Sequence, residues 1–291
     1  MENEIIDTNK NDLFSSMRGF NLQELLYQIE NFDLEYRDTL NLPKELTFGV
    51  EIEYENTQKE KVDNYINRHL NGWISKRDGS LFTGGEINSP IMTDDIKYWK
   101  ELEKICNYLE KKNADTSHNA GGHIHIGSSI LKPDDITGWR HFLKLYTAYE
   151  HIVFRFIYGD KLSARKNIKR YASPIADHLY RRLNKINQAK YLYEIEWILP
   201  YERNGAVNFN NIDFSPYPSR EKQTIEFRSP NSSTNPTIWQ NNINTFSKIL
   251  VSSKEHVMDE AFLDYKLKNE LDNLIERYNN LKNILEVAYG I

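Results

Sequence analysis

Three short segments of the chain alternate polar, chemically reactive side chains with apolar ones. They are Glu51-Ile52-Glu53, His123-Ile124-His125 and Glu226-Phe227-Arg228. Residues two positions apart point to the same face of a β-strand, so each segment predicts a strand with one chemical face and one apolar face. Two glutamates on one strand repel each other unless a cation lies beside them. The pattern therefore predicts a sheet whose chemical face binds metal.

The spacing of apolar residues elsewhere predicts a mixture of short strands and amphipathic helices. Strands are expected over residues 47–54, 73–76, 85–89, 121–128, 205–212 and 223–229, with turns at Asp78-Gly79-Ser80 and through Pro216 and Pro218. Helices are expected over 22–32 and 61–70, after a cap at Thr93, from Pro133, after Asn235 and over 259–287. Because there is no strand–helix–strand rhythm and no glycine-rich strand-to-helix turn, this order favours an α+β fold with an antiparallel sheet backed by helices.

Two of the expected helices carry apolar stripes that should face the core. The first stripe comprises Ile96, Trp99, Leu102, Ile105 and Leu109, and the second comprises Ile136, Trp139, Leu143, Tyr146, Ile152 and Phe156. The single cysteine, Cys106, lies beside the first stripe, and we interpret it as a packing residue rather than a nucleophile.

The composition bounds the environment and the partners of the chain. Its 291 residues are 39% hydrophobic, and no apolar run approaches the roughly 20 residues of a membrane span. The segment Met1-Glu2-Asn3-Glu4 lacks the basic start of a secretory signal, and a lone cysteine fits a reducing compartment, so we expect a cytoplasmic protein with no membrane partner. A net charge of −5 argues against a nucleic-acid partner, although Arg165 and Arg170 are candidates for contacts with a phosphorylated small molecule.

Carboxylates dominate the candidate metal ligands. The ligands are Glu51, Glu53, Glu86, His123 and Glu226, with His125 next. Such a set suits Mg²⁺ or Mn²⁺ better than structural zinc, which prefers thiolate and imidazole. A zinc site on the two histidines alone, or two ordinary hydrogen-bonded strand histidines, are the alternatives that the sequence leaves open.

Arg228 is suited to a different role, because a guanidinium beside a metal-bound carboxylate can steady a phosphoryl group. An ordinary cross-strand salt bridge is the alternative for Arg228, and a simple turn residue is the alternative for Asp78. The chain has no glycine-rich phosphate loop, so metal and arginine side chains would have to hold any bound nucleotide.

Five ordered motifs resemble the amidoligase family, a branch of the carboxylate–amine ligases that includes glutamine synthetase and glutamate–cysteine ligase. The motifs are Gly49-Val50-Glu51-Ile52-Glu53, Asp78-Gly79-Ser80, Gly85-Glu86-Ile87 with Ser89-Pro90, Gly122-His123-Ile124-His125-Ile126-Gly127 and Thr224-Ile225-Glu226-Phe227-Arg228. The resemblance spans residues 47–250 and implies a catalytic domain at 45–252, between a helical extension at 1–44 and a helical flank at 253–291. It also implies that the antiparallel sheet is curved into the catalytic half-barrel of glutamine synthetase.

The resemblance further implies an ATP-dependent ligase that forms an amide or isopeptide bond through an acyl phosphate. ATP and Mg²⁺ or Mn²⁺ would be its cofactors, and its substrates a carboxylate and an amine carried by small molecules, peptides or a protein tail. By position, Arg228 matches the phosphoryl-stabilising residue and Asp78 a residue near the amine. The metal-binding positions match Glu51, Glu53, Glu86, His123 and Glu226, and looser substrate or nucleotide contacts match Arg155, Arg165 and Asn208.

Other interpretations remain open at this point. A metal-dependent amide hydrolase would also gather carboxylates and histidines, and a non-catalytic relative could keep the sheet as a binding protein. His125 has no single assigned role, and the C-terminal flank is a candidate contact in a homo-oligomer.

Overall fold

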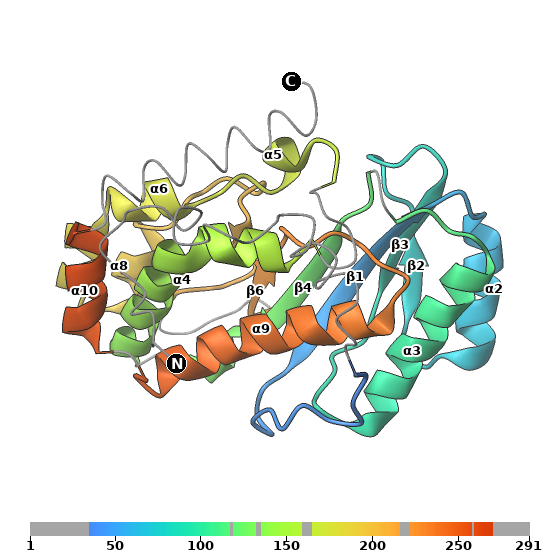
Figure 1. Ribbon diagram of the computed structural model, residues 1–291, viewed down its shortest axis with the longest axis horizontal. Helices are drawn as coiled ribbons and strands as arrows, with labels where there is room; N and C mark the ends of the chain where they lie inside the picture. The colour runs from blue at the N-terminus through green and yellow to red at the C-terminus, as the bar shows by residue number, and fades with distance from the viewer. Residues whose placement is uncertain are drawn as a thin grey trace, which may run out of the picture. The chain divides into compact units, whose positions relative to one another are not determined.

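A six-stranded antiparallel sheet forms the centre of the computed structural model (Figure 1). The structure describes residues 35–116, 119–131, 135–158, 165–215, 222–257 and 259–269. The strand order is β2-β3-β1-β4-β6-β5, and every neighbouring pair is antiparallel. The strands are β1 (Phe48–Glu55), β2 (Ile74–Lys76), β3 (Gly84–Asn88), β4 (Gly122–Gly127), β5 (Val207–Asn208) and β6 (Thr224–Phe227).

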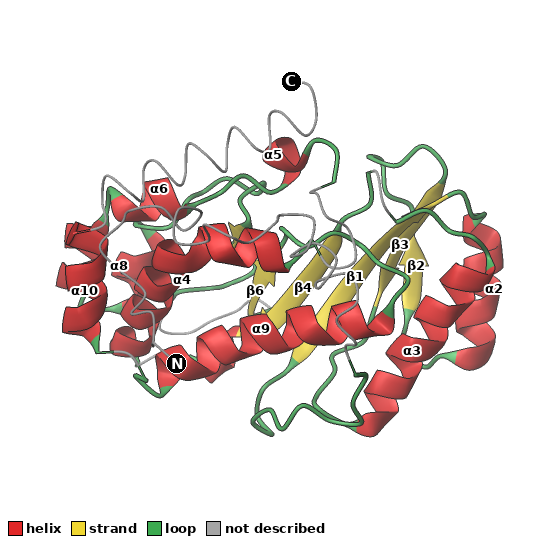
Figure 2. Cartoon of the chain, in the orientation of Figure 1, coloured by secondary structure: helices red, strands yellow, loops and turns green. Residues whose placement is uncertain are grey.

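Helices occupy most of the remaining described chain, as Figure 2 shows in red. The longer ones are α2 (Lys59–His69), α3 (Ile96–Lys111), α4 (Ile136–Phe156), α9 (Pro236–Lys254) and α10 (Glu260–Asn269). The shorter ones are α5 (Ile168–Tyr171), α6 (Ala176–Tyr180), α7 (Leu183–Gln188), α8 (Leu192–Glu196) and the 3₁₀ turn η1 (Ser128–Ile130). An antiparallel sheet backed by helices confirms the α+β prediction. All described residues except Glu35 belong to the second of two units, Tyr36–Ile291.

Helices α3, α4 and α9 cover one face of the sheet (Figure 1). The isoleucines and phenylalanines of the alternating segments are buried on this apolar face. Phe227 of β6 stacks on Phe246 of α9 with 4.0 Å between ring centroids, and its edge meets Phe142 of α4. Phe48 of β1 stacks on Trp99 of α3 at 5.1 Å. Because one face of each strand is committed to this core, the residues between are held on the opposite face.

The prediction of the second apolar stripe, on α4, is wrong in the last turns of that helix. Ile152 and Phe156 are exposed there, at 40% and 68%. The buried face of α4 continues instead through Glu150, Val153 and Ile157, which keep the 3.6-residue spacing from Tyr146. A glutamate on the buried side interrupted the apolar pattern and shifted the predicted stripe by one residue.

The helix predicted to begin after a cap at Thr93 also needs a correction at its start. The residue that caps α3 is Asp95, whose side chain accepts a hydrogen bond from Lys97 N, and not Thr93. Ile96 is consequently in the exposed first turn, whereas Trp99, Leu102 and Cys106 are fully buried. The interpretation of Cys106 as a packing residue agrees with that burial.

Several predicted segments lie partly or wholly outside the described residues. The helix over 22–32, the turn through Pro216 and Pro218 and the start at Pro133 are outside, and α10 covers only the first part of the helix expected over 259–287. The strand predicted over 205–212 is much shorter, at Val207–Asn208, because its edge position pairs it with β6 alone. None of the described helices is both long and apolar enough to pass through a membrane.

Glu150 is expected to make stability fall as pH rises. Its side chain is almost completely buried and accepts hydrogen bonds from Ile175 N at 2.9 Å and Ala176 N at 2.8 Å. Burial raises the pKa of Glu150 from 4.5 to about 7, against the opposing effect of these two hydrogen bonds. Between these two pKa values the folded chain keeps a proton that the unfolded chain loses, so the free energy of unfolding decreases as pH rises through this window.

Urea unfolding at pH 5 and pH 8 measures this effect, with an expected loss on the order of 1–3 kcal/mol. Glu150→Gln should flatten that part of the pH dependence, although it also removes one acceptor for the backbone. Glu60→Gln, on the exposed side of α2, is the control and should keep the wild-type slope. Equal slopes in wild type and Glu150→Gln would contradict the assignment.

Candidate active site

The strand register gathers the predicted site residues on one face of the sheet. Glu51 of β1 lies opposite His123 of β4 on one side and Asn88 of β3 on the other. The further cross-strand pairs are Glu53 with Glu86, His125 with Glu226, and Asn208 with Glu226. Directly paired residues of an antiparallel ladder share a face, so side chains from five strands meet here. The convergence of Glu51, Glu53, Glu86, His123 and Glu226 is therefore a property of the register.

Glu51 is at the centre of this face and contacts both histidines. Its Oε2 lies 2.9 Å from Nδ1 of His123, and its Oε1 lies 3.1 Å from Nε2 of His125. Burial alone would raise the pKa of Glu51, but hydrogen bonds and charge from the two imidazoles hold it well below its usual range. Glu51 is thus an ionised carboxylate at neutral pH. His125 also lies 3.2 Å from Thr224 Oγ1, which fixes its ring on the side of β6.

Glu226 is the second centre, and it is almost fully buried. One of its oxygens accepts a hydrogen bond from Arg228 Nη1, and the other accepts one from Asn208 Nδ2 at 2.7 Å. Nδ1 of His123 lies 3.7 Å from the same carboxylate. A second contact orients the guanidinium of Arg228, because its Nε donates a hydrogen bond to the carbonyl of Tyr171 at 3.3 Å. A guanidinium and a carboxylate therefore sit side by side on the chemical face.

The third part of the face combines Glu53 and Glu86 with the turn after β2. Oε2 of Glu53 accepts a hydrogen bond from Gly121 N at 2.5 Å, and Asn88 Nδ2 donates to Glu86 at 2.6 Å. Burial raises the pKa of Glu86, and the negative charge of Glu51 raises it further. Asp78 joins these two glutamates, because one oxygen of each of the three carboxylates lies within 4.8 Å of the others.

The chemistry of these donors fits hard divalent cations. Two sets each bring ligand atoms within 4.8 Å of one another: Glu51, His125 and Glu226, and Glu53, Asp78 and Glu86. The second set is all carboxylate oxygen and the first has two oxygen ligands and one nitrogen, as Mg²⁺ or Mn²⁺ prefers. Asn88 Oδ1 is buried next to Glu86 and has no hydrogen-bond partner among the described atoms. An unpaired buried acceptor among crowded carboxylates is what a cation would satisfy.

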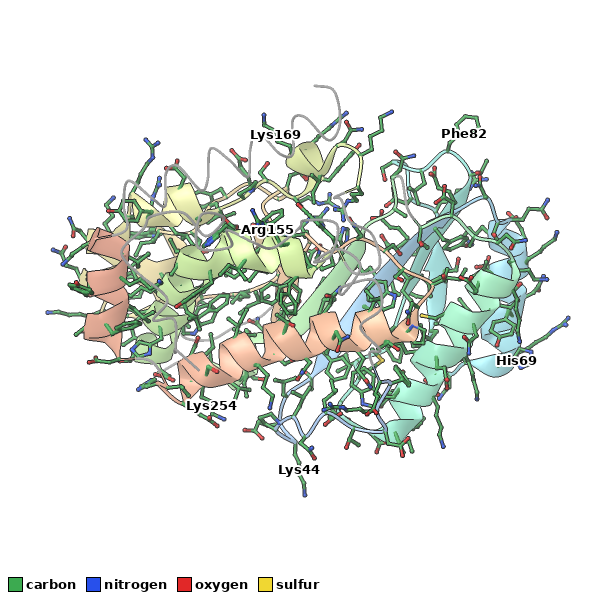
Figure 3. The ribbon with its side chains drawn as sticks, viewed as in Figure 1. Lys44, His69, Phe82, Arg155, Lys169 and Lys254 are labelled. Carbon is green, nitrogen blue, oxygen red and sulfur yellow. The ribbon has the colours of Figure 1, made fainter. Side chains whose placement is uncertain are left out.

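The residues predicted to contact substrate or nucleotide are placed differently from one another. Asn208 joins the face through Glu226, whereas Arg155 is exposed on α4 (Figure 3), one of the helices that cover the apolar face. Arg165 is 2% exposed and donates to the carbonyls of Pro230 at 2.5 Å and Arg228 at 2.9 Å. The described contacts of Arg165 thus hold the backbone after β6.

Two residues of the face had no role in the prediction. Asn88 lies two positions after Glu86, and Thr224 lies two positions before Glu226. Strand alternation therefore places each of them on the same face as the neighbouring predicted ligand. Uncharged side chains carry little signal alone, and their role becomes visible only through their contacts. His125, unassigned from the sequence, belongs to the first ligand set.

The fold and this face define a protein with an open antiparallel sheet that carries carboxylate and imidazole side chains together on one face. Residues 74–250, more than half of the chain, match the family described as "Putative amidoligase enzyme", and the chain belongs to that family. The resemblance to the amidoligase family is thereby confirmed over residues 74–250, which contain four of the five motifs, and Gly49-Val50-Glu51-Ile52-Glu53 precedes the matched range. No curated protein matches the chain.

Proposed function

We propose that the protein is an ATP-dependent carboxylate–amine ligase that joins its substrates through an acyl phosphate. The observation that carries the proposal is the pairing of Arg228 with Glu226 beside two carboxylate-rich ligand sets. Metal ligands alone would serve many hydrolases, but a buried guanidinium on the same face supplies the positive charge that phosphoryl transfer needs. Family membership points to amide-bond formation in the same way.

The proposed reaction has two displacement steps. An oxygen of the substrate carboxylate forms a bond to the γ-phosphorus of ATP while the bond to the β–γ bridging oxygen breaks, and ADP leaves. The amine nitrogen then bonds to the acyl carbon, the carbon–oxygen bond to phosphate breaks, and the amine loses a proton. Neither step requires a protein nucleophile, so the residues act by position and charge.

The residues divide this work between them. Glu51, His125 and Glu226 would hold one Mg²⁺ or Mn²⁺ and Glu53 and Glu86 another, with His123 between the two sets. Metal bound there supplies charge neutralisation for the phosphate oxygens. Arg228 stabilises the negative charge of the transferred group. Asp78, in a partly exposed turn, orients the incoming ammonium. The proposal also includes the fold, in which the six-stranded sheet is curved like the catalytic sheet of glutamine synthetase.

ADP release with ATP, Mg²⁺ and pools of carboxylates and amines tests the reaction. ADP is expected only when a carboxylate and an amine are both present, and Mn²⁺ with ATP is expected to raise Tm because ligand binds the folded state. Arg228→Ala should lower ADP formation about 100-fold or more, because the charge that stabilises the transferred group is lost. Arg181→Ala, on the exposed surface of α6's end, is the control. Hydrolysis of an amide in the absence of ATP would contradict the proposed ligase function and favour a hydrolase instead.

A further inference from the structure

An exposed group of aromatic rings lies on α8 and the turn that follows it. The rings of Tyr191 and Tyr193 stack with 5.5 Å between centroids, and Tyr193 meets the edge of Trp197 at 6.1 Å. Trp197 is 69% exposed, and Tyr201 is more exposed still. Surface clusters of large apolar side chains are uncommon without a binding role, because they leave apolar area in water. We call Tyr191, Tyr193, Trp197 and Tyr201 the aromatic cluster.

A pocket of about 210 Å³ adjoins the aromatic cluster. Its lining includes Tyr201 and the apolar side chains of Leu199, Phe209 and Phe214, together with two polar residues, Glu196 and Asn210. An apolar pocket with a few polar groups is the usual form of a small-molecule site. Its size suits a short aliphatic chain rather than a folded peptide segment.

The pocket is connected to the active site through one side chain. Asn210 N donates to Asn208 Oδ1 at 2.9 Å, and Asn208 Nδ2 donates to Glu226 Oε2 at 2.7 Å. Phe209 and Asn210 directly follow β5, so the pocket wall begins at the residue next to Asn208. A bound molecule would therefore lie beside the edge strand of the catalytic sheet.

The charge of this region selects a cation. Between Tyr191 and Tyr201 the charged residues are Glu194 and Glu196, with no lysine or arginine. Glu194 accepts hydrogen bonds from the backbone nitrogens of Lys190 and Tyr191, whereas no other described residue pairs with the Glu196 carboxylate. A carboxylate beside exposed aromatic rings is favourable for an alkylammonium group, which binds through both charge and cation–π attraction.

We propose that this pocket binds an aliphatic diamine. The methylene chain occupies the apolar lining, and one ammonium group contacts Glu196 and the faces of the aromatic cluster. The second amino group lies at the Asn210 end of the lining, next to β5. Diamine binding by this pocket does not depend on the proposed ligase function.

Fluorescence quenching tests the binding directly, because Trp197 differs from every other tryptophan. Trp73, Trp99, Trp139 and Trp239 are at most 3% exposed, so acrylamide quenching reports mainly on Trp197. Cadaverine, a five-carbon diamine, is expected to lower the quenching constant by about two-fold at saturation, because it covers one ring face. Pentanediol, its neutral counterpart, is expected to have no such effect.

Variants locate the charge that recognises the ligand. Glu196→Gln should raise the half-saturating cadaverine concentration about tenfold, the effect of one charge-assisted contact. Glu202→Gln, a nearby exposed glutamate outside the pocket lining, is the matched control and should bind as wild type. Equal protection by pentanediol, no protection by cadaverine, or an unchanged Glu196→Gln variant would each overturn the proposal.

The quenching assay contains no ATP and no metal, so its outcome is independent of the ligase. If no substrate pair supports ADP release but cadaverine still protects Trp197, the binding site stands and the proposed function fails.

Discussion

Glu226→Gln is expected to weaken Mn²⁺ binding at least about 100-fold and to abolish substrate-dependent ADP release. Glu226 belongs to the first ligand set and also accepts hydrogen bonds from Arg228 and Asn208. The glutamine keeps the size of the side chain but removes its charge. Its amide nitrogen is a donor, so the side chain cannot accept both of the hydrogen bonds that the carboxylate accepts from Arg228 and Asn208. Losing a metal ligand costs more than the 10–100-fold typical of residues that only support ligands. Mn²⁺ titration followed by electron paramagnetic resonance measures the change without any substrate.

The control for this variant is Glu101→Gln. Glu101 is also a buried carboxylate, but it lies on α3 and accepts from Trp73 Nε1 at 2.9 Å, away from the chemical face. It should bind Mn²⁺ as wild type does. Far-ultraviolet circular dichroism checks that both variants are folded, since removing the partner of the buried Arg228 has its own cost. Wild-type Mn²⁺ affinity in folded Glu226→Gln would remove Glu226 from the metal site.

The chemical face was largely predictable from the sequence, for a reason specific to β-strands. Glu51 and Glu53 are two residues apart, as are His123 and His125, so each pair had to share a face once the segment was a strand. The intervening isoleucines fixed which face was buried. Register could not be predicted in this way, yet any antiparallel arrangement of these strands would bring their polar faces to the same side of the sheet.

The supporting contacts were not predictable, because they join segments through backbone atoms. Arg165 donates to the carbonyls of Pro230 and Arg228, and carbonyl groups carry no sequence signal. Glu150 has the same character, since its partners are the backbone nitrogens of Ile175 and Ala176. A polar side chain with backbone partners looks like a surface residue in a hydrophobic pattern, which is why the stripe on α4 was misplaced at Ile152.

The choice between a structural and a catalytic role for Arg228 also depends on three-dimensional context. The sequence allowed either an ordinary salt bridge or a phosphoryl-stabilising group. The structure shows an ion pair with Glu226, but that glutamate itself belongs to a ligand set, and Arg228 is held from behind by Tyr171. A pair built only for stability would not need to face a cluster of further carboxylates, because buried pairs contribute little net stability.

Phe227→Ala is expected to lower the free energy of unfolding by about 3–5 kcal/mol. The Phe227 ring is fully buried and packs on Phe246, Phe142 and Tyr146, so its removal leaves a cavity where β6 meets α4 and α9. Urea unfolding measures the loss. Phe82→Ala is the control, because that ring is 96% exposed, projects away from the sheet in Figure 3 and should cost little.

The position of Phe227 between two site residues gives this variant a second effect. Glu226 and Arg228 point to the chemical face only because Phe227 holds the opposite face of β6 against the helices. We therefore expect weaker Mn²⁺ binding in Phe227→Ala even under conditions where the variant is fully folded, with no change in any ligand. Loss of stability with unchanged Mn²⁺ affinity would show that the ladders with β4 and β5 keep β6 in register, and that the aromatic core does not position the site.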